Sequence, residues 1–147
     1  MVDTVLEPLS PEACLDLLRV NVLGRIAVVS DSFPVVLPVN YRLVEEDGSE
    51  PFIALRTRSG NVIDRGREEV AFEVDDIDMN RGTGWSVLVQ GVLRHLGRAP
   101  ARSDLLDPHS WLRHERDSWL VLSPRVITGR RLRAVDIEWA FDVSAYL

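Results

Sequence analysis

Short β-type segments separated by turn residues recur along most of the chain, and this pattern restricts the fold more than any other feature. Each segment is rich in apolar residues and is bounded by Gly, Pro, Asp or Ser, as strands are. No regular alternation of strand and helix accompanies them, so a parallel sheet of βαβ units is not expected. The pattern predicts a mainly β protein with short helices, folded as a closed or partly closed antiparallel barrel. The predicted strands cover residues 25–30, 33–43, 52–57, 70–74, 85–96, 119–123 and 126–135.

Two prolines constrain the second of these strands. Pro34 and Pro38 lie within residues 33–43, and proline has no backbone N–H to give to a neighbouring strand. We therefore expect this strand to be an edge, or to be bulged, where the prolines sit. Polar residues 45–51 form the hairpin loop that follows.

Helical signals lie outside the strands. Ser10 and Pro11 predict a helix start, because serine favours the N-cap and proline the first helical position. Gly24 is expected to break this helix. A second helix is predicted over residues 59–69, with Val62 and Ile63 inward and Asp64 outward, and a further helical region over residues 101–116.

The 147 residues are expected to form one domain, with the core between about residues 9 and 135. Residues 136–147 carry Trp139, Phe141 and Tyr146, so this segment is expected to dock on the domain.

The charged residues exclude several classes of function. The 17 basic residues are outnumbered by 23 acidic ones, for a net charge of −6, which argues against non-specific binding of nucleic acid. All of the basic residues are arginine. Lysine Schiff-base chemistry and a Walker-type lysine are therefore excluded, and any phosphate held by charge must be held by arginine.

Cys14 and the N-terminal residues favour a protein of the reducing cytoplasm. A single cysteine forms no disulfide within the chain, and Cys14 is expected to pack as a small apolar residue. The N-terminus shows no apolar signal region, and no run of 18 apolar residues predicts a membrane span. A cytoplasmic protein without a membrane partner is expected.

Residues 56–61, with the sequence Arg-Thr-Arg-Ser-Gly-Asn, follow a predicted strand and precede a predicted helix. The free N–H groups of a helix start favour a phosphate, and Arg56 or Arg58 would add charged hydrogen bonds. The alternative is an ordinary polar turn capped by Ser59. Because side chains alternate along a strand, Arg56 and Arg58 should share one face and Thr57 should point the other way.

Two further positions suggest a planar ligand. Asn40 interrupts an apolar strand, and a buried amide needs hydrogen-bond partners, which a ligand edge or a neighbouring strand could supply. Trp85 stands between Gly84 and Ser86 at the mouth of a strand. A flat ring that meets another flat ring explains this placement better than core filling does. Together with residues 56–60, these positions indicate a flavin-type cofactor.

Other common sites are not indicated. His95, His109 and His114 lack the spacing of known metal motifs, and the acidic run between residues 73 and 78 reads as a solvated hairpin rim. No metal site is predicted. The chain has no G-x-S-x-G elbow for a serine hydrolase and no G-x-G-x-x-G for a Rossmann domain.

Taken together, the motifs resemble those of the pyridoxamine 5′-phosphate oxidase-like split-barrel family that binds FMN, and most of all its actinobacterial and nitroimidazole-resistance-like branch. The resemblance extends over roughly residues 9–135. It implies a six- to seven-stranded antiparallel split β-barrel of the FMN-binding type. The segments that carry it are residues 24–28, 38–41, 56–57, 70–75, 84–91 and 127–131.

The resemblance implies a homodimer with two FMN sites at the interface. The strand matching Val39, Asn40 and Tyr41 would line the flavin ring, and the segment matching residues 56–61 would meet the phosphate. Trp85 and Ser86 would reach the flavin held mainly by the other copy, and Arg131 would lie near the site. The cofactor-binding residues implied are Val39, Asn40, Tyr41, Arg56, Thr57, Arg58, Ser59, Asn61, Trp85, Ser86 and Arg131.

One departure concerns Asn61. Relatives often carry a phosphate-binding lysine at this position, and here it is an uncharged amide. Arg58 or Arg65 would then replace the charge, or the affinity for phosphate is weak, or the ligand differs. Some split barrels bind the deazaflavin F420 or haem, and these stay open as alternatives to FMN.

The function implied is a flavin-dependent oxidoreductase acting on small substrates, nitro-aromatic compounds among them. The alternative is a flavin-binding carrier or a redox or stress sensor without turnover, because no general acid is evident. The substrate and the electron donor are not indicated by the sequence.

Overall fold

The strands of this protein close into a ring, as shown by a computed structural model that describes residues 3–97, 107–108 and 118–135. Within those residues the chain forms seven antiparallel strands and one helix. In chain order the elements are β1 (Asp3–Pro8), α1 (Pro11–Val20), β2 (Leu23–Ser30), β3 (Phe33–Val44), β4 (Phe52–Thr57), β5 (Arg67–Asp78), β6 (Thr83–Gly97) and β7 (Ser118–Val135).

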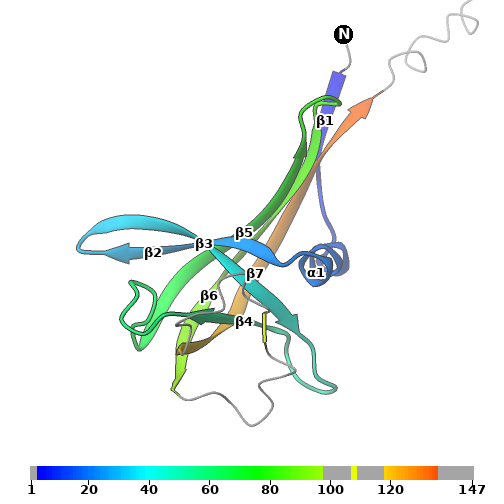
Figure 1. Cartoon of the computed structure of the whole chain (residues 1–147). Coiled ribbons are helices and arrows are strands. Elements are labelled where there is room, and N and C mark those ends of the chain that lie inside the picture. Colours follow the sequence, from blue (N-terminus) through cyan, green and yellow to red (C-terminus); the bar gives the residue numbers. More distant parts are fainter. Residues whose placement is uncertain (1–2, 98–106, 109–117, 136–147) are drawn as a thin grey trace, which may run out of the picture.

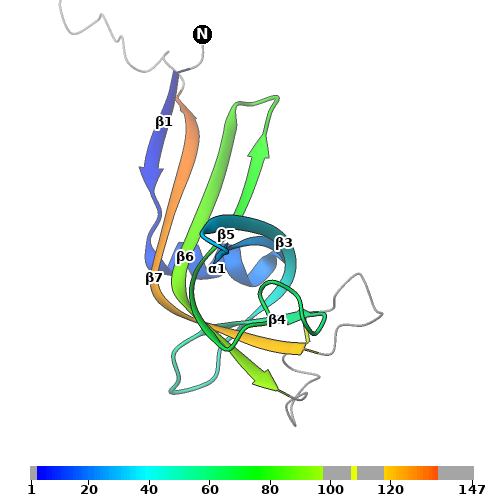
Figure 2. The same cartoon turned by 90° about the vertical axis from the view of Figure 1, so that its left-hand side faces the viewer.

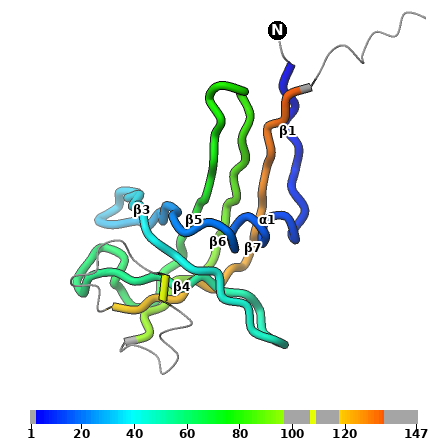
Figure 3. The backbone as a smooth tube through the Cα atoms, turned by 45° about the vertical axis from the view of Figure 1, so that its right-hand side comes forward, coloured from blue at the N-terminus to red at the C-terminus, as the bar shows by residue number. Residues whose placement is uncertain are grey.

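The ring runs in the order β7-β4-β3-β2-β5-β6 and closes where β6 pairs with β7. β1 lies outside the ring and pairs with the last part of β7, from Pro8 opposite Arg130 to Asp3 opposite Val135. The hairpin of β5 and β6 and the pair of β1 and β7 rise together beyond the ring (Figures 1, 2 and 3). We call this extension, formed by residues 3–8, 75–86 and 130–135, the arm. The predicted mainly β, antiparallel barrel is confirmed.

The prolines lie where the sequence predicts an unpaired edge. Pro34 is opposite Val29 and Pro38 is opposite Arg25, in the half of β3 that pairs with β2. The pairing of β3 with β4 starts only at Tyr41. In the described register, neither proline therefore has to donate to a strand on its second side.

The core fills the ring with alternate residues of each strand. Tyr41 and Phe72 meet at its centre, edge to face, with their ring centroids 4.9 Å apart. Gly24 allows this arrangement, because a Cβ at that position would lie 2.4 Å from the Phe72 ring. The helix α1 packs against β3, β6 and β7, with Cys14 and Leu18 buried.

The start of α1 agrees with the sequence prediction, and its end does not. The Ser10 hydroxyl accepts a hydrogen bond from the Ala13 N–H at 3.1 Å, and Pro11 is the first helical residue. The helix ends at Val20, because Asn21 takes an extended conformation and its side-chain amide donates to the Leu17 carbonyl. Gly24 belongs to β2 instead. No helix in the described part of the chain is long and apolar enough to cross a membrane.

Two further predicted elements differ from the structure. Residues 59–66 form a succession of turns, and residues 67–69 already belong to β5, so the predicted helix over residues 59–69 is wrong. The strands predicted over residues 119–123 and 126–135 are one continuous strand, β7, with a register shift opposite Gln90 and Gly91. The predictions for residues 101–116 and 136–147 lie almost wholly outside the described residues.

Tyr41→Phe is expected to weaken the fold and to alter its response to alkaline pH. The Tyr41 hydroxyl donates to the Leu18 carbonyl at 2.7 Å, and losing this bond should cost about 1 kcal/mol. Burial raises the pKa of Tyr41 above the usual value. As the pH rises, the hydroxyl proton therefore dissociates from the unfolded chain before it dissociates from the folded one. Stability from this group is present below about pH 10 and declines above it. Denaturant unfolding between about pH 9 and 11 should show that the free energy of unfolding falls less steeply with pH for the variant than for the wild type. Parallel falls in the two proteins would contradict this account.

Candidate functional site

The predicted ring-binding residues lie side by side where β3 meets β4. Tyr41 is opposite Leu55, and both side chains belong to the core, as does Val39. Asn40 points to the outer face of the barrel, where it is 8% exposed and its amide donates to the Val22 carbonyl at 3.4 Å. The Tyr41 hydroxyl is bound to α1, and Asn40, although on the other face of β3 from Val39 and Tyr41, is itself buried.

Thr57 and Arg56 lie next to each other at the end of β4 and point in opposite directions, as predicted. Thr57 is buried on the inner face, opposite Ser118 of β7. The guanidinium of Arg56 lies over the ring of Trp119, with 4.7 Å between Cζ and the ring centroid. Its Nη1 also contacts the Asp107 carboxylate at 3.3 Å. Arg56 is therefore held in place by an aromatic face and bonded to an anion.

Arg58, Ser59 and Asn61 lie in the turns that follow β4, and no helix start stands behind them. The argument that a helix N-terminus binds a phosphate here is therefore wrong, although the residues remain grouped beyond Arg56. The Asn61 side-chain oxygen accepts a hydrogen bond from the Ile63 N–H at 3.3 Å. Asn61 thus shapes its own turn.

A hydrogen-bonded cluster that the sequence analysis missed lies behind this turn. One carboxylate oxygen of Asp64 accepts from the Ser118 hydroxyl at 2.5 Å and lies 3.0 Å from Nε2 of His95. The other oxygen accepts from the Gly60 N–H at 2.9 Å. The side chain of Asp64 is only 10% exposed, although the sequence pattern placed it outward. No local pattern could reveal this cluster, because its members come from three distant segments.

Trp85 and Arg131 lie together at the other end of β6, in the arm. They are opposite each other across β6 and β7, with Asp76 on the far side of Trp85. Together with neighbouring arm residues they line a groove of about 260 Å³. Trp85 is partly buried against the core, on the same face as Val87. Ser86 points to the opposite face and lines a second groove of about 600 Å³.

The structure thus separates the predicted site residues into two groups within one copy. Trp119, which carries Arg56 on its ring, pairs with Gly97 at the last residue of β6. Trp85 lies near the first residue of β6. Since a strand rises by about 3.3 Å per residue, about 40 Å of strand lies along β6 between Trp85 and Gly97. The ring-binding residues of β3 lie nearer to Trp85 than this, because Val39 is opposite Gly24, and the next residue, Arg25, is opposite Glu73, which is itself opposite Leu88 of β6.

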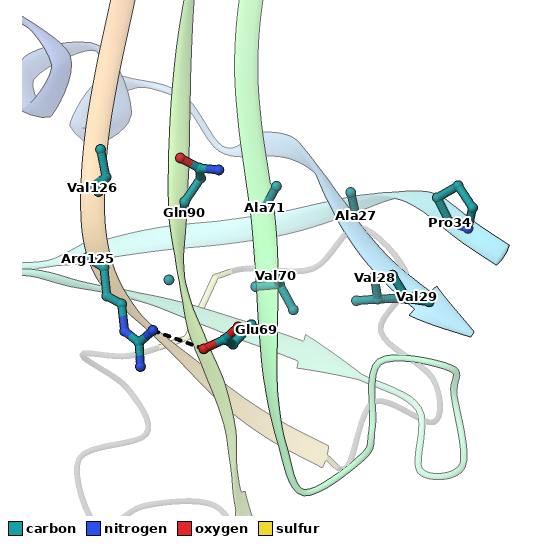
Figure 4. A pocket seen from close by; sticks show the side chains of 11 residues that line it. Ala27, Val28, Val29, Pro34, Glu69, Val70, Ala71, Gln90, Arg125 and Val126 are labelled. Atoms are coloured by element: carbon teal, nitrogen blue, oxygen red, sulfur yellow. Dashed lines mark hydrogen bonds and ion pairs between the residues drawn. The ribbon is translucent and has the colours of Figure 1, made fainter. Parts of the chain in front are cut away.

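The outer face of the ring carries a third feature, a row of four apolar residues and one glutamine across five strands. We call this row, formed by Val36, Ala27, Ala71, Gln90 and Val126, the shelf, because these residues stand opposite one another in successive strand pairs. A groove of about 500 Å³ lies over it, bordered by the ion pair of Glu69 and Arg125 at 2.9 Å (Figure 4).

Charged and apolar groups frame the shelf on its two sides. Toward the arm, Arg25 contacts the carboxylates of Glu73 and Asp75, each at 3.0 Å. Burial and the neighbouring Asp75 raise the pKa of Glu73. On the side of the β2–β3 turn, Val29 and Phe33 are exposed. The face is therefore apolar in the middle, with ion pairs on the arm side (Arg25 with Glu73 and Asp75) and on the opposite side (Glu69 with Arg125).

Within the described residues, no group of three or more His, Cys, Asp or Glu side chains is arranged to hold a metal ion. Asp64 and His95 are close together, but Ser118 completes their cluster.

Comparisons with known proteins agree with this architecture. An uncharacterized protein of Mycobacterium tuberculosis is 32% identical over 117 residues, which is 76% of this chain and 75% of that protein. The FAD-binding protein from Mycobacterium smegmatis is 31% identical, with a TM-score of 0.65 over 88% of this chain and 100% of that one. A protein of unknown function from Corynebacterium diphtheriae has a TM-score of 0.71 at 24% identity, over 87% of this chain and 98% of that one. The fold is that of the flavin-binding split barrels, as the sequence predicts.

The family model described as pyridoxamine 5′-phosphate oxidase matches residues 10–131, from the cap of α1 to the strand position opposite Trp85. This span contains the ring and all of the predicted site residues. The chain therefore belongs to the pyridoxamine 5′-phosphate oxidase family.

Proposed function

We propose that the protein is a homodimer that binds a flavin nucleotide in two sites, each completed by both copies, and that it passes electrons between this flavin and a small organic substrate. The proposal rests chiefly on the separation of Trp85 and Arg131 from Arg56 along β6. It is supported by a relative, 31% identical over its whole length, that is named an FAD-binding protein.

The residues at the end of β4 fit the phosphate end of such a ligand. The Arg56 guanidinium is stacked on Trp119 and contacts a carboxylate oxygen of Asp107. Arginine donors suit a carboxylate and a phosphate alike, so a phosphate would take the place of Asp107 on the Arg56 guanidinium. Arg58, Ser59 and Asn61 follow directly and would surround the same group. FMN is the ligand proposed, and FAD carries the same ring with a further phosphate.

The ring would lie against the outer face of β3. Asn40 would give hydrogen bonds to its polar edge, next to the backbone of Val39 and Tyr41. The side chain of Thr57 is buried on the inner face, so Thr57 would help to orient the ring from the inner side of the barrel wall. The partner's arm would then bring an indole ring and an arginine to the exposed side of the flavin, and Ser86 would line the adjoining groove.

The shelf is the surface that we propose for the second copy. Four of its five residues are alanine or valine, Gln90 is the fifth, and they belong to five neighbouring strands; Val29 and Phe33 extend the apolar area. A face of this kind is typical of a protein–protein contact. Pairing two copies through the shelf would also bring the arm of one copy to the flavin site of the other.

The flavin would supply the reversible uptake and release of electrons, and the chain's own residues would bind and orient it and exclude water. We propose small substrates, nitro-aromatic compounds among them, and a cytoplasmic location. A flavin carrier or sensor without turnover is the second candidate. It is favoured by the pairing of Asp64 and His95 with each other, which engages both groups in a structural contact.

Arg56→Ala is expected to weaken flavin binding. The purified wild-type protein should bind FMN, followed by quenching of flavin fluorescence and by the flavin absorbance bands. Loss of a charged hydrogen bond should reduce the affinity by about 1.5–3 kcal/mol, or roughly 10- to 150-fold. Arg19→Ala is the matched control, because Arg19 lies on α1 and, like Arg56, is held by carboxylates, those of Asp16 and Glu45. A wild type that binds neither FMN nor FAD would overturn the proposed function, and an unchanged Arg56→Ala affinity would remove Arg56 from the site.

Ala71→Arg is expected to separate the two copies. Ala71 lies in the middle of the shelf with its side chain outward, so a long charged residue fits the free subunit and clashes with a partner. Sedimentation velocity should show a dimer for the wild type and a monomer for the variant, with weakened flavin binding. Val20→Arg, at the exposed end of α1, should stay dimeric. A monomeric wild type would contradict the shared site.

Turnover distinguishes the two candidate functions. If the protein is an oxidoreductase, the flavin reduced by NAD(P)H or by reduced F420 should be reoxidised by a nitro-aromatic compound, with equivalent loss of the compound. Stopped-flow absorbance should show faster reoxidation in the complex than for free reduced FMN. Equal rates across a panel of small acceptors would favour the carrier or sensor.

A further inference from the structure

The turn after β4 has a defined shape although it contains no helix. The Asn61 N–H donates to the Arg58 carbonyl at 3.0 Å, and the Asp64 N–H donates to the Asn61 carbonyl at 2.8 Å. Ile63 is buried in the core and fixes the middle of the turn. Gly60 has a φ of +79°, a left-handed conformation that glycine takes at little cost. The backbone of residues 58–64 is therefore set by packing as well as by hydrogen bonds.

Asp64 joins this turn to the two long strands of the ring. Its carboxylate holds the Gly60 N–H on one side and the Ser118 hydroxyl on the other, with Nε2 of His95 within 3.0 Å. Ser118 is the first residue of β7, and His95 lies near the end of β6. The carboxylate thus fixes the turn to the place where β6 and β7 begin to close the barrel.

The same three residue types form the catalytic triad of hydrolases, but the geometry here is different. In a triad the two ring nitrogens of histidine serve two different partners. Here Nε2 alone lies close to both the Ser118 oxygen, at 2.7 Å, and the Asp64 carboxylate. Ser118 is also 1% exposed, so no substrate reaches its hydroxyl. A serine has one proton to give, and Ser118 gives it to Asp64; Nε2 must therefore carry a proton and act as the donor.

We propose that Asp64, supported by Ser118 and His95, is the positioning residue for the phosphate end of the flavin. This inference rests on the proposed function. Asp64 orders the turn that carries Arg58, Ser59 and Asn61, and so their polar groups are aimed before the ligand arrives. Preorganised donors bind an anion more tightly than mobile ones, because less freedom is lost on binding. In a chain without lysine, a fixed turn beside Arg56 would add hydrogen-bond donors to the charge that arginine supplies.

The proposal concerns the phosphate and not the ring, which gives it a specific test. Riboflavin has the ring of FMN and lacks the phosphate. The wild type should bind FMN at least tenfold more tightly than riboflavin. Asp64→Asn keeps the size of the side chain but replaces the charged carboxylate, which accepts from the Gly60 N–H, with a neutral amide. It should lower the preference for FMN over riboflavin at least fivefold, with the riboflavin affinity nearly unchanged. Ser118→Ala should act in the same direction.

Asp47→Asn makes the same chemical change in the exposed loop between β3 and β4 and is the control. Hydrogen exchange of the Gly60 amide gives a second measurement, because it should accelerate in Asp64→Asn and not in Asp47→Asn. If Asp64→Asn does not fold, Ser118→Ala carries the test.

The outcomes separate this inference from the proposed function. A wild type that binds no flavin overturns both. A wild type that prefers FMN while Asp64→Asn and Ser118→Ala keep that preference overturns only the role of Asp64. Variants that lose FMN and riboflavin to the same extent also overturn it, since a general loss of structure affects both ligands. A wild type that binds FMN no better than riboflavin shows that no phosphate site exists beside Asp64.

Discussion

The pairing of β6 with β7 along almost their whole lengths is the constraint on which the rest of this structure depends. One end of this ladder closes the barrel, where Leu93 lies opposite Leu122, and the other end forms the arm, where Trp85 lies opposite Arg131. Strand geometry has a fixed rise, so a position along the ladder decides which part of the molecule a side chain can reach. The ladder therefore holds the barrel together and at the same time carries Trp85 and Arg131 out into the arm.

The strands could be predicted from the sequence because their causes are local. Apolar residues alternate along β5 and β6, and Pro34 and Pro38 mark the side of β3 that has no partner. The start of α1 is equally local, since Ser10 bonds to a residue three positions further on. The family resemblance, carried by short motifs in the right order, then gives the barrel and its closure, which local pattern alone leaves undecided.

The turn after β4 could not be predicted, and the reason is physical. Adjacent Val62 and Ile63 followed by charged residues are typical of one face of a helix, yet Ile63 is buried by a turn that Asp64 fixes from outside. The partners of Asp64 lie in β6 and β7. Only the closed barrel brings them together, so tertiary contacts override the local helical preference. Asp64, predicted on the charged outer side of that helix, is instead the largely buried hydrogen-bonding centre of the turn.

Arginine at position 56 suits this architecture in a way that lysine would not. Its planar guanidinium stacks on Trp119 and still presents N–H donors at its edge, where Asp107 now accepts. A compact ammonium group would contact the indole without a fixed orientation. The contact between the guanidinium and the Asp107 carboxylate is a charge-assisted one. The aromatic ring sets the direction of that charge and the turn ordered by Asp64 sets the donors around it, so the absence of lysine from the chain is compatible with a phosphate site at the end of β4.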